Sequence, residues 1–480
     1  MNSTFPLTLT QRDIFFDQMY YIDSPLYNIG GYIKCSGIDI DRMQAAHKQL
    51  ALSHDVFGIR IVQRQETVCQ YISEDRSFEL PVYDFSKEGN PEQHAIDWLN
   101  QRFQQKIDFI DRQLCFGYLL KLTKEDYWYV GLSHHLAMDG WGFSNWSYKL
   151  AEYYNKPDQK LVVEQEGLSY QEMSESDQKY LKSKRYESDK TFWREHFESS
   201  GEKLLTAYYK SQFSNVKYVP STRYRHYINR DVFAACCVAA NEVGVGVPQF
   251  ILGVLAYYFS AVCDTNQVAF GIPAHNRKNH KQKNKVGVFT SVSTLNVDVP
   301  GSITFQQLVQ GIAKLQKASF RHQRFPVGDL MSTLNSNSHE RSLYDVSFNY
   351  LKLDYGELTF GSSDASVIYH ASGFDTTPLT VTIWDGDDED IEMQLDYNHA
   401  YFSNEEVQGL ADRFYQLLHF FSQQTNLARP LSELPVLAES EKTKLIAAIS
   451  HTQNNYPHDV CVHELFEQQA AVRPDAVALV

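Results

Sequence analysis

The stretch GLSHHLAMDGWG, residues 131–142, places two adjacent histidines at the junction between a predicted strand and a predicted helix. The apolar run at residues 128–135 predicts a short strand that leads directly into the motif. Asp139 is a favourable helix N-cap, and the apolar residues after it have the spacing of one helical face: Phe143, Trp146, Leu150 and Tyr154. The stretch therefore predicts a strand, a turn and a helix, with the histidines at the turn.

The geometry of a strand argues against a metal ion at the two histidines. Neighbouring residues of a strand point to opposite faces, so His134 and His135 would not both ligate one ion. The sequence has no HExxH motif and no second cluster of histidines and cysteines to complete a ligand set. We therefore predict that the site holds no metal.

Two interpretations of the motif remain open on the residues alone. In the structural one, Asp139 caps the helix, Gly140 permits an unusual backbone angle, and one histidine fills the core. In the catalytic one, one imidazole faces a cleft as a general base, because the pKa of histidine lies near neutral pH. Asp139 would then order the turn, and Gly140 would leave room for a substrate close to the backbone.

Composition limits the class of protein. At 480 residues the chain is long enough for two or three domains, and its 43% hydrophobic and 21% charged residues are typical of a folded protein. The formal net charge of -15 and the pI near 5.6 disfavour nucleic acid as a partner, because binding to phosphates needs a basic surface.

Cysteine usage and hydropathy predict the compartment. The 7 cysteines are odd in number and form no CxxC pair, which is typical of reduced thiols in a cytosolic protein. No signal peptide is visible, and the most apolar segment, residues 250–262, is too short to cross a bilayer. We therefore expect a cytoplasmic protein with no membrane partner.

The α/β segments of the chain fall into two parts of similar size. Residues 155–190 are polar and predict a surface crossing. A Pro-punctuated linker at residues 428–442 precedes the segment 456–480, whose end predicts the first strand of a further domain. The acidic run DGDDED, residues 385–390, predicts a solvated hairpin turn, because its glycine is misplaced for a calcium loop.

Further segments occur in the order typical of one protein family. LTLTQRDIFFDQ, residues 7–18, resembles LTxAQRxxWFxxQ. Residues 271–289 resemble GxPxxxR…xGxF, and Arg277 stands at the position of the motif arginine. LYDVSFNYLKL, residues 343–353, resembles PLFxVxFNYxN, and residues 456–480 resemble the start of an adenylation domain. Because HHLAMDG also matches HHxxxDG, the chain is identified as a member of the condensation domains of nonribosomal peptide synthetases, within the chloramphenicol acetyltransferase-like superfamily.

The resemblance implies a layered α/β (α+β) fold of two acetyltransferase-like lobes that form a V-shaped pseudo-dimer around a central tunnel. It implies an N-terminal lobe at residues 1–175, a C-terminal lobe at 176–438, and a linker with a truncated adenylation domain at 439–480. Domains of this family form an amide bond: the amine of an aminoacyl group on a carrier protein's phosphopantetheine arm attacks an acyl thioester.

The resemblance also implies roles for individual residues. His135 corresponds to the catalytic histidine of the motif and His134 to the structural one. Asp139 is expected to pair with Arg277. The residues expected beside the substrates are Gly140, Trp141, Ser291 and Asn349, the last as the cleft asparagine of the second lobe. The domain is expected to bind no cofactor of its own.

Two features favour a chain-initiating domain, which acylates the first amino acid with a fatty acyl group. The family match begins close to Met1 and leads into an adenylation domain. Where elongating members read GxFVNTLPLR, this chain reads GVFTSVSTLNV, with Ser291 replacing the asparagine and Asn296 the arginine. The alternatives are an elongating domain that receives a peptide from a separate synthetase, and a non-catalytic scaffold.

The expected partners follow from the chain-initiating interpretation. The donor would be an acyl-CoA or an acyl carrier protein, and the acceptor would be carried on a peptidyl carrier protein. The adenylation domain would be the neighbour in cis.

Overall fold

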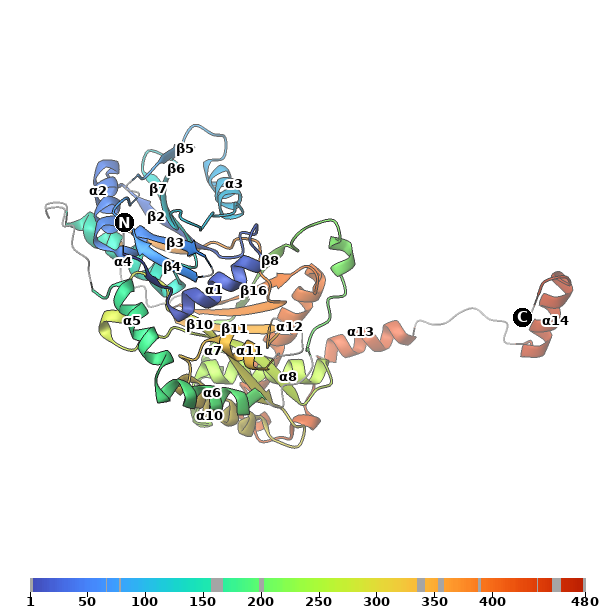
Figure 1. Cartoon of the computed structure of the whole chain (residues 1–480). Helices are drawn as coiled ribbons and strands as arrows, with labels where there is room; N and C mark the ends of the chain where they lie inside the picture. Colours follow the sequence, from blue (N-terminus) through green and yellow to red (C-terminus); the bar gives the residue numbers. More distant parts are fainter. Residues whose placement is uncertain are drawn as a thin grey trace. The chain divides into compact units, whose positions relative to one another are not determined.

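The two largest of the four β-sheets in the described residues form the framework of the chain in its computed structural model (Figure 1). The structure describes residues 3–65, 67–76, 79–156, 167–197, 203–334, 342–352, 358–386, 390–437, 439–450 and 459–477. The chain divides into two compact units, Met1–Leu434 and Pro435–Val480. Both sheets belong to the first unit and are covered by helices, so the predicted α/β class is confirmed.

The first sheet has five strands in the order β14-β2-β7-β6-β5. Its central strand β7 (Asp126–His134) pairs antiparallel with β2 (Asn28–Ser36) and β6 (Cys115–Lys121), and the histidine motif follows its carboxyl end. Apolar side chains of α2 (Ile40–Ser53) and α4 (Gly140–Asn155) pack in one core against this sheet, and α3 (Pro91–Phe103) packs in another. The other elements of this part are β1 (Phe5–Pro6), α1 (Leu9–Tyr20), β3 (Ile59–Arg64), β4 (Thr67–Ile72), β5 (Val82–Asp84) and α5 (Tyr170–Leu181).

The second sheet has six strands in the order β10-β9-β11-β15-β16-β8. Helix α8 (Val247–Val262), which follows Gly246 and carries Pro248 in its first turn, is buried from Phe250 to Phe259 in the core of this part. The strands are β8 (Ser221–Ile228), β9 (Gln267–Ala274), β10 (Ser291–Asp298), β11 (Val346–Lys352), β15 (Leu379–Asp385) and β16 (Ile391–Asn398). The other helices are α6 (Lys184–Phe197), α7 (Arg230–Glu242), α9 (His280–Lys283), α10 (Phe305–Arg321), α11 (Val327–Leu334) and α12 (Asn404–Phe421).

The two sheets are tied together by segments that cross from one to the other. Strand β14 (Ser366–Tyr369) follows the short pair β12 (Thr359–Phe360) and β13 (Ser363–Asp364) and adds to the edge of the five-stranded sheet beside β2. The β9–β10 connection, residues 275–290, buries Val286, Val288 and Phe289 in the core that α2 and α4 form. The second half of the chain therefore completes the structure around the histidine motif.

One prediction about the middle of the chain, the surface crossing, is wrong in detail. Within residues 155–190, the described part is not a plain surface crossing but holds α5 and the start of α6, whose Tyr170, Tyr180 and Asp189 are buried. The lobe boundary predicted between residues 175 and 176 falls inside α5, which a Ser169–Glu172 capping box begins. Burial of these aromatic and acidic residues depends on distant partners, which local polarity does not reveal.

Other predictions concern the hairpin and the second unit. Strands β15 and β16 pair antiparallel, as the hairpin interpretation requires, while residues 387–389 of its turn lie outside the described residues. The second unit contains α13 (Glu439–Ser450) and α14 (Val462–Val472), and the strand predicted after α14 extends into residues that are not described. All seven cysteines are free thiols.

Within the described residues, no single helix has the length and apolar composition to cross a membrane. The pair α7 and α8 meets that requirement only when both helices are counted together across a 99° bend.

Helix α1 is clasped to α11 through a partly buried carboxylate, that of Asp13. Asp13 accepts a hydrogen bond from the Val327 backbone N–H at 3.1 Å, at the first residue of α11, and Arg12 pairs with Asp329 at 2.6 Å. Burial and the neighbouring Asp329 raise the pKa of Asp13 to about 7, although Arg12 opposes the shift. The clasp therefore contains a carboxyl group that titrates near neutral pH.

We expect Asp13→Asn to remove part of the pH dependence of stability. The unfolded chain releases this proton near pH 4, whereas the folded chain holds it to about pH 7, so wild-type stability declines as the pH rises between these values. Asparagine does not ionise, and its side-chain oxygen can still accept from Val327. Melting temperatures are measured at pH 5 and pH 8. The melting temperature of the variant relative to wild type should be higher at pH 8 than at pH 5. An equal difference at both pH values would contradict the assignment.

Candidate active site

The histidine motif folds as the sequence predicts. Strand β7 ends at His134, and α4 begins at Gly140 with Asp139 as its N-cap, because the Asp139 carboxylate accepts from the Gly142 backbone N–H at 2.6 Å. The apolar residues predicted on one helix face are all buried: Phe143, Trp146, Leu150 and Tyr154. His134 is the last residue of the strand, and His135 begins the turn that leads to α4.

His134 is locked into the core. Its side chain is 1% exposed, its Nδ1 accepts from the Leu136 backbone N–H at 3.1 Å, and its Nε2 lies 3.3 Å from the Gln18 side-chain oxygen. Burial lowers the pKa of His134 to about 3, with a small further contribution from His135. An uncharged ring with both nitrogens in contact with protein supports the backbone and has no nitrogen left for a substrate.

His135 is placed differently from its neighbour. Its side chain is only partly buried, and its backbone N–H donates to the Tyr27 carbonyl at 2.8 Å while the Tyr27 ring meets the imidazole edge-on. Its Nδ1 is buried without a partner among the described residues. Burial lowers the pKa of His135, and the Asp139 carboxylate offsets only part of that shift. The imidazole is therefore neutral at pH 7, in the state that a general base requires.

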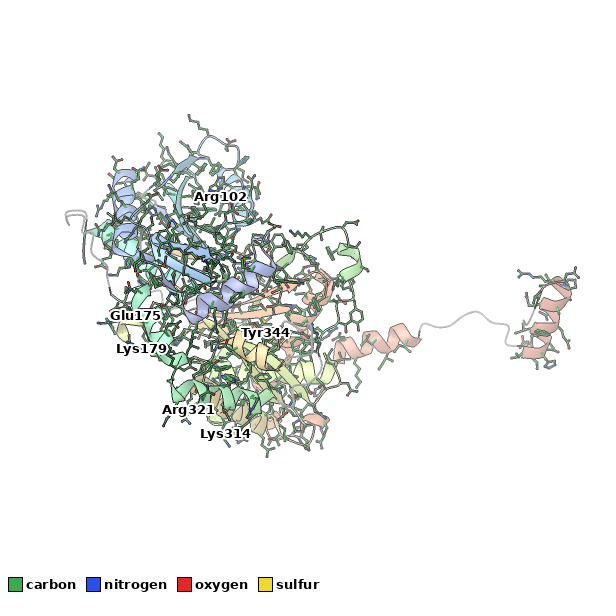
Figure 2. All side chains as sticks on the ribbon, viewed as in Figure 1. Arg102, Glu175, Lys179, Lys314, Arg321 and Tyr344 are labelled. Atoms are coloured by element: carbon green, nitrogen blue, oxygen red, sulfur yellow. The ribbon has the colours of Figure 1, made fainter. Side chains whose placement is uncertain are left out.

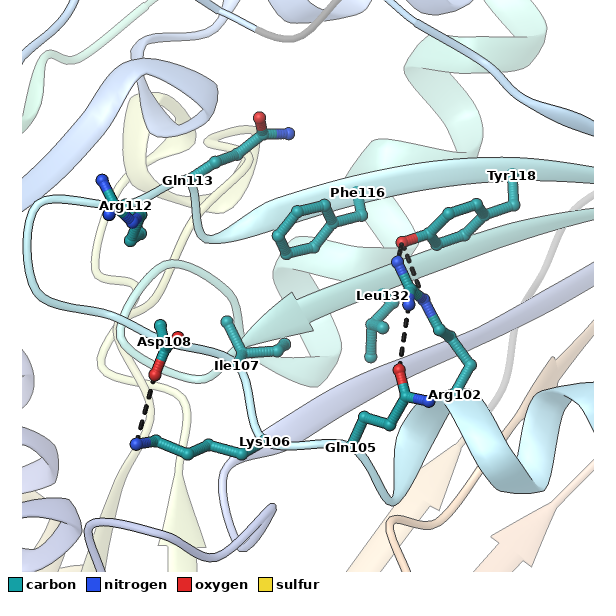
Figure 3. Close-up of a pocket in the computed structure, with 10 residues that line it drawn as sticks. All are labelled: Arg102, Gln105, Lys106, Ile107, Asp108, Arg112, Gln113, Phe116, Tyr118 and Leu132. Carbon is teal, nitrogen blue, oxygen red and sulfur yellow. Dashed lines mark hydrogen bonds and ion pairs between the residues drawn. The ribbon is translucent and has the colours of Figure 1, made fainter.

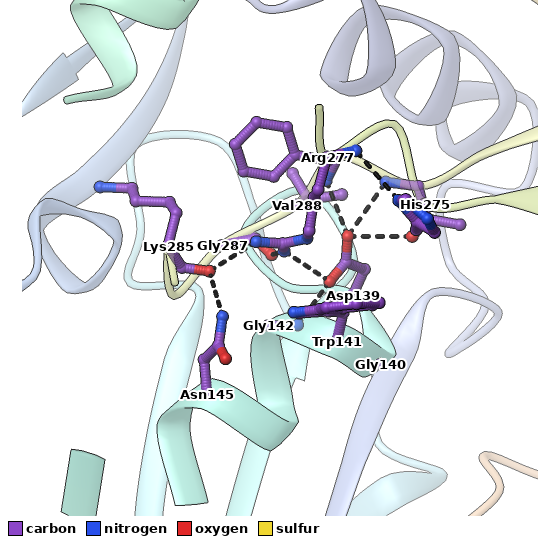
Figure 4. Close-up of polar contacts among 12 residues, drawn as sticks. Asp139, Gly140, Trp141, Gly142, Asn145, His275, Arg277, Lys285, Gly287 and Val288 are labelled. Atoms are coloured by element: carbon purple, nitrogen blue, oxygen red, sulfur yellow. Dashed lines mark hydrogen bonds and ion pairs between the residues drawn. The ribbon is translucent and has the colours of Figure 1, made fainter. Parts of the chain in front are cut away.

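The Asp139 carboxylate is held by hydrogen bonds from several parts of the chain (Figure 4). The side chain is 0% exposed and accepts five hydrogen bonds, including one from the Arg277 guanidinium at 2.9 Å. Although burial opposes ionisation, Arg277 and the backbone donors of Phe289, Gly142 and Thr290 lower the pKa of Asp139. A carboxylate saturated in this way does not accept a proton from a substrate.

Arg277 joins the motif to the β9–β10 connection. The side chain is 1% exposed, pairs with Asp139, and also donates to the backbone carbonyls of Gln282, Lys285 and Gly287. Its guanidinium lies 4.4 Å from the centre of the Phe289 ring. The ion pair that the family resemblance implies is thus present, and it fixes the shape of the whole connection.

A second buried ion pair anchors the same connection and was missed at the sequence level. The Lys285 ammonium pairs with Asp55, both side chains being nearly inaccessible, and lies over the Tyr170 ring. The other Asp55 oxygen accepts from the Tyr170 backbone N–H at 2.7 Å. A lysine in a polar run gave no sign of burial, because its partner lies far away in the sequence.

Gly140 and Trp141 are the first two residues of α4. A Cβ added at Gly140 would find no atom within 4 Å, so open space adjoins the backbone there. The Gly140 carbonyl accepts from the Tyr369 hydroxyl at 3.1 Å, which β14 supplies. Trp141 is 39% exposed and its indole N–H donates to the Lys283 carbonyl at 2.8 Å, so this side chain also holds the β9–β10 connection.

Ser291 and Asn349 lie on strands of the second sheet. Ser291 is the first residue of β10, accepts from the Asn276 side chain at 2.7 Å, and lines a cavity of about 290 Å³ together with Asn276 and Phe289. Asn349 is a partly exposed residue of β11, in register with Thr382 of β15. Contacts through Phe289 link Ser291 to Asp139, whereas no described contact links Asn349 to the motif.

The described residues contain no group of three or more histidine, cysteine, aspartate or glutamate side chains arranged to hold a metal ion. His135 offers a neutral, partly exposed imidazole for proton chemistry or hydrogen bonding to a reactant, and Gly140 of the same motif leaves open space beside the backbone. This arrangement suits a reaction in which an amine attacks an activated acyl group.

The chain is similar to domains of large multidomain synthetases. It is 25% identical over 490 residues to surfactin synthase subunit 1 of Bacillus subtilis (strain 168), with 99% of this chain and 13% of that protein covered. It is 24% identical over 480 residues to the dimodular nonribosomal peptide synthase of the same organism, with 99% and 20% covered. The chain therefore spans 13% to 20% of the length of these two curated relatives.

Solved structures share the fold. A mutant of the starter condensation domain of rhizomide synthetase RzmA, in complex with C8-CoA and Leu-SNAC, superimposes with a TM-score of 0.79 at 22% identity, covering 91% of this chain and 98% of that one. The first condensation domain of the calcium-dependent antibiotic synthetase, in complex with a substrate analogue, gives a TM-score of 0.77 at 17% identity, covering 91% and 99%.

A family model settles the assignment. The model described as the condensation domain matches residues 1–446, which is nearly the whole chain. Together with the HHxxxDG geometry and the shared fold, this match shows that the chain belongs to the condensation domain family of nonribosomal peptide synthetases, whose members form amide bonds by acyl transfer.

Proposed function

We propose that this domain starts a peptide by transferring a fatty acyl group to the amine of an aminoacyl group on a carrier protein. The observation that carries the proposal is the neutral, partly exposed imidazole of His135, in a motif whose Gly140 leaves open space beside the backbone. His135 accepts the proton of the attacking amine or holds that amine in place. His134, Asp139 and Arg277 position it without touching the substrates.

The chemistry suits a site with few reactive groups. A thioester already reacts with amines, so holding the two tethered reactants in alignment supplies most of the acceleration, with effective molarities of about 10⁵–10⁸ M. A general base adds roughly 10²–10⁴-fold. One imidazole that meets the aligned reactants is therefore sufficient, and the domain needs no cofactor beyond the phosphopantetheine arms of its substrates.

Two observations favour a fatty acyl donor over a peptidyl one. Ser291 lines the cavity of about 290 Å³ where elongating members of the family have asparagine, and Asn296 is buried on the same strand in place of arginine. Starter condensation domains with bound C8-CoA are among the structures that share this fold. We accordingly propose acyl-CoA or an acyl carrier protein as the donor.

The neighbours of the domain follow from the same proposal. A peptidyl carrier protein presents the aminoacyl acceptor. Residues 439–480, in the second compact unit, form the linker and the start of an adenylation domain that acts in cis. Residues 1–175 and 176–438 correspond to the two acetyltransferase-like lobes, with Asn349 facing the substrates from the second.

The intact mass of the carrier protein tests the donor. The chain is incubated with a carrier loaded with one amino acid at a time and with octanoyl-CoA, an octanoyl carrier protein or a peptidyl carrier protein. We expect the mass of the N-octanoyl aminoacyl product with one of the first two donors. Transfer from the peptidyl carrier, with none from either acyl donor, would instead establish an elongating domain. Absence of transfer from every donor would favour a non-catalytic scaffold.

A further inference from the structure

A second cavity, of about 250 Å³, lies against the five-stranded sheet, and neither Asp139 nor Arg277 is among the residues that line it (Figure 3). It is formed by the end of α3, the segment that follows it, and strands β6 and β7. Its lining combines cationic groups with an apolar floor. Nothing in the proposed acyl transfer uses this cavity.

Hydrogen bonds fix the Arg102 guanidinium at one side of the cavity. Arg102 lies in the last turn of α3, among the side chains that surround the five-stranded sheet (Figure 2). Its Nε and Nη2 donate to the Tyr118 hydroxyl at 3.0 and 2.6 Å, and its Nη1 donates to the Gln105 side chain at 2.9 Å. These bonds fix the guanidinium and leave two of its five N–H groups, together with the Tyr118 hydroxyl proton, available to a ligand.

Arg112 supplies a second cation. It is exposed, and its guanidinium makes only a long contact of 3.5 Å with the Asp111 carbonyl. In the view of Figure 3, Phe116 lies between Arg112 and Arg102. Within the described residues, neither guanidinium forms an ion pair with a carboxylate.

The remaining charges of the cavity cancel. Lys106 pairs with Asp108 at 3.1 Å and with Asp23 at 3.4 Å, so its charge is already neutralised. Arg102 and Arg112 together leave about two positive charges unpaired in a chain whose formal net charge is -15. A phosphate monoester carries about −1.5 to −2 charges at neutral pH and accepts several hydrogen bonds, which matches two guanidinium groups and a phenol.

The floor of the cavity is apolar. Ile107, Phe116 and Leu132 line it below the cationic groups, and Leu132 is 2% exposed. We propose that this cavity binds a phosphate monoester carried on a flat or apolar group, with the phosphate between Arg102 and Arg112 and the attached group against Phe116. This inference does not depend on the identity of the acyl donor.

Calorimetric titration of the 480-residue chain with phenyl phosphate tests the site. We expect saturable binding that weakens at least 10-fold in Arg112→Gln, whose side chain is exposed and supports no described structural contact beyond Asp111. Arg194→Gln is the matched control, because Arg194 is an exposed arginine of α6 outside the cavity and its loss changes the net charge equally. Arg102→Lys should also weaken binding, since lysine lacks the guanidinium fork.

Two results would overturn the proposal: no saturable binding to wild type, or equal affinity in wild type and Arg112→Gln. The source of the phosphate is separated by coenzyme A, which carries a 3′-phosphate monoester, and dephospho-CoA, which lacks it. If Arg112→Gln binds coenzyme A more weakly than wild type does, while its binding of dephospho-CoA is unchanged, the ligand is the CoA nucleotide. Weaker binding of phenyl phosphate, with coenzyme A unaffected, would identify a free phosphate ester.

Discussion

Replacing His135 with alanine is expected to slow amide formation by about 10²–10⁴-fold while the domain stays folded. The imidazole is the neutral, partly exposed group of the motif, and its Nδ1 has no partner among the described residues, so its loss disrupts no described side-chain hydrogen bond. Residual turnover should remain, because alignment of the two thioester-bound reactants contributes independently. Single-turnover formation of the carrier-bound amide, followed by intact mass, measures the loss.

The matched variant for this prediction is His134→Ala. Its ring accepts from the Leu136 N–H and lies against Gln18, so its removal should lower the melting temperature as well as the rate. His135→Ala should melt within a few degrees of wild type. An unchanged rate in His135→Ala on a carrier-bound amine would show that this imidazole takes no part in the reaction.

Replacing Asp139 with alanine is expected to destabilise the domain by about 3–5 kcal/mol. The substitution leaves the Arg277 guanidinium buried at 1% exposure without its carboxylate and deprives four further donors of an acceptor. It also releases the β9–β10 connection from α4. The midpoint of urea unfolding measures the loss, and activity should fall with it.

Asp41→Ala provides the control for this charge removal. Asp41 lies exposed in the first turn of α2, so its loss should change stability by about 0.5 kcal/mol or less. The loss of stability in Asp139→Asn should lie between those of Asp139→Ala and Asp41→Ala, because the single side-chain oxygen of asparagine accepts only part of the hydrogen bonds. Unfolding of Asp139→Ala at the urea concentration of wild type would contradict a supporting role for the Asp139–Arg277 pair.

Local features of the fold were predictable because their signals lie close together in the sequence. The Asp139 cap and the apolar spacing after it predicted α4, and the apolar run at residues 128–135 predicted β7, which ends at His134. The start of α12 carries a local signal of the same kind, a capping box between Ser403 and Glu406. In each case a few neighbouring residues determine the element.

Features that depend on distant contacts were not predictable. The Lys285–Asp55 ion pair joins residues 230 positions apart, and β14 crosses to the other sheet to place Tyr369 against Gly140. The motif alone also left open which histidine supports the fold. That distinction depends on Gln18 of α1, which approaches His134 and not His135.

The charge state of His135 tests the account most directly. If an uncharged imidazole meets the amine, its pKa in the folded chain must lie below the ordinary value of 6.5, because burial outweighs the nearby Asp139 carboxylate. NMR titration of histidine-labelled protein, with the His135 resonance assigned by comparison with His135→Gln, measures this pKa. We predict a midpoint below pH 6.5. A midpoint above pH 7 would contradict the account, because the ring would then be mostly protonated at neutral pH and unable to accept the amine proton.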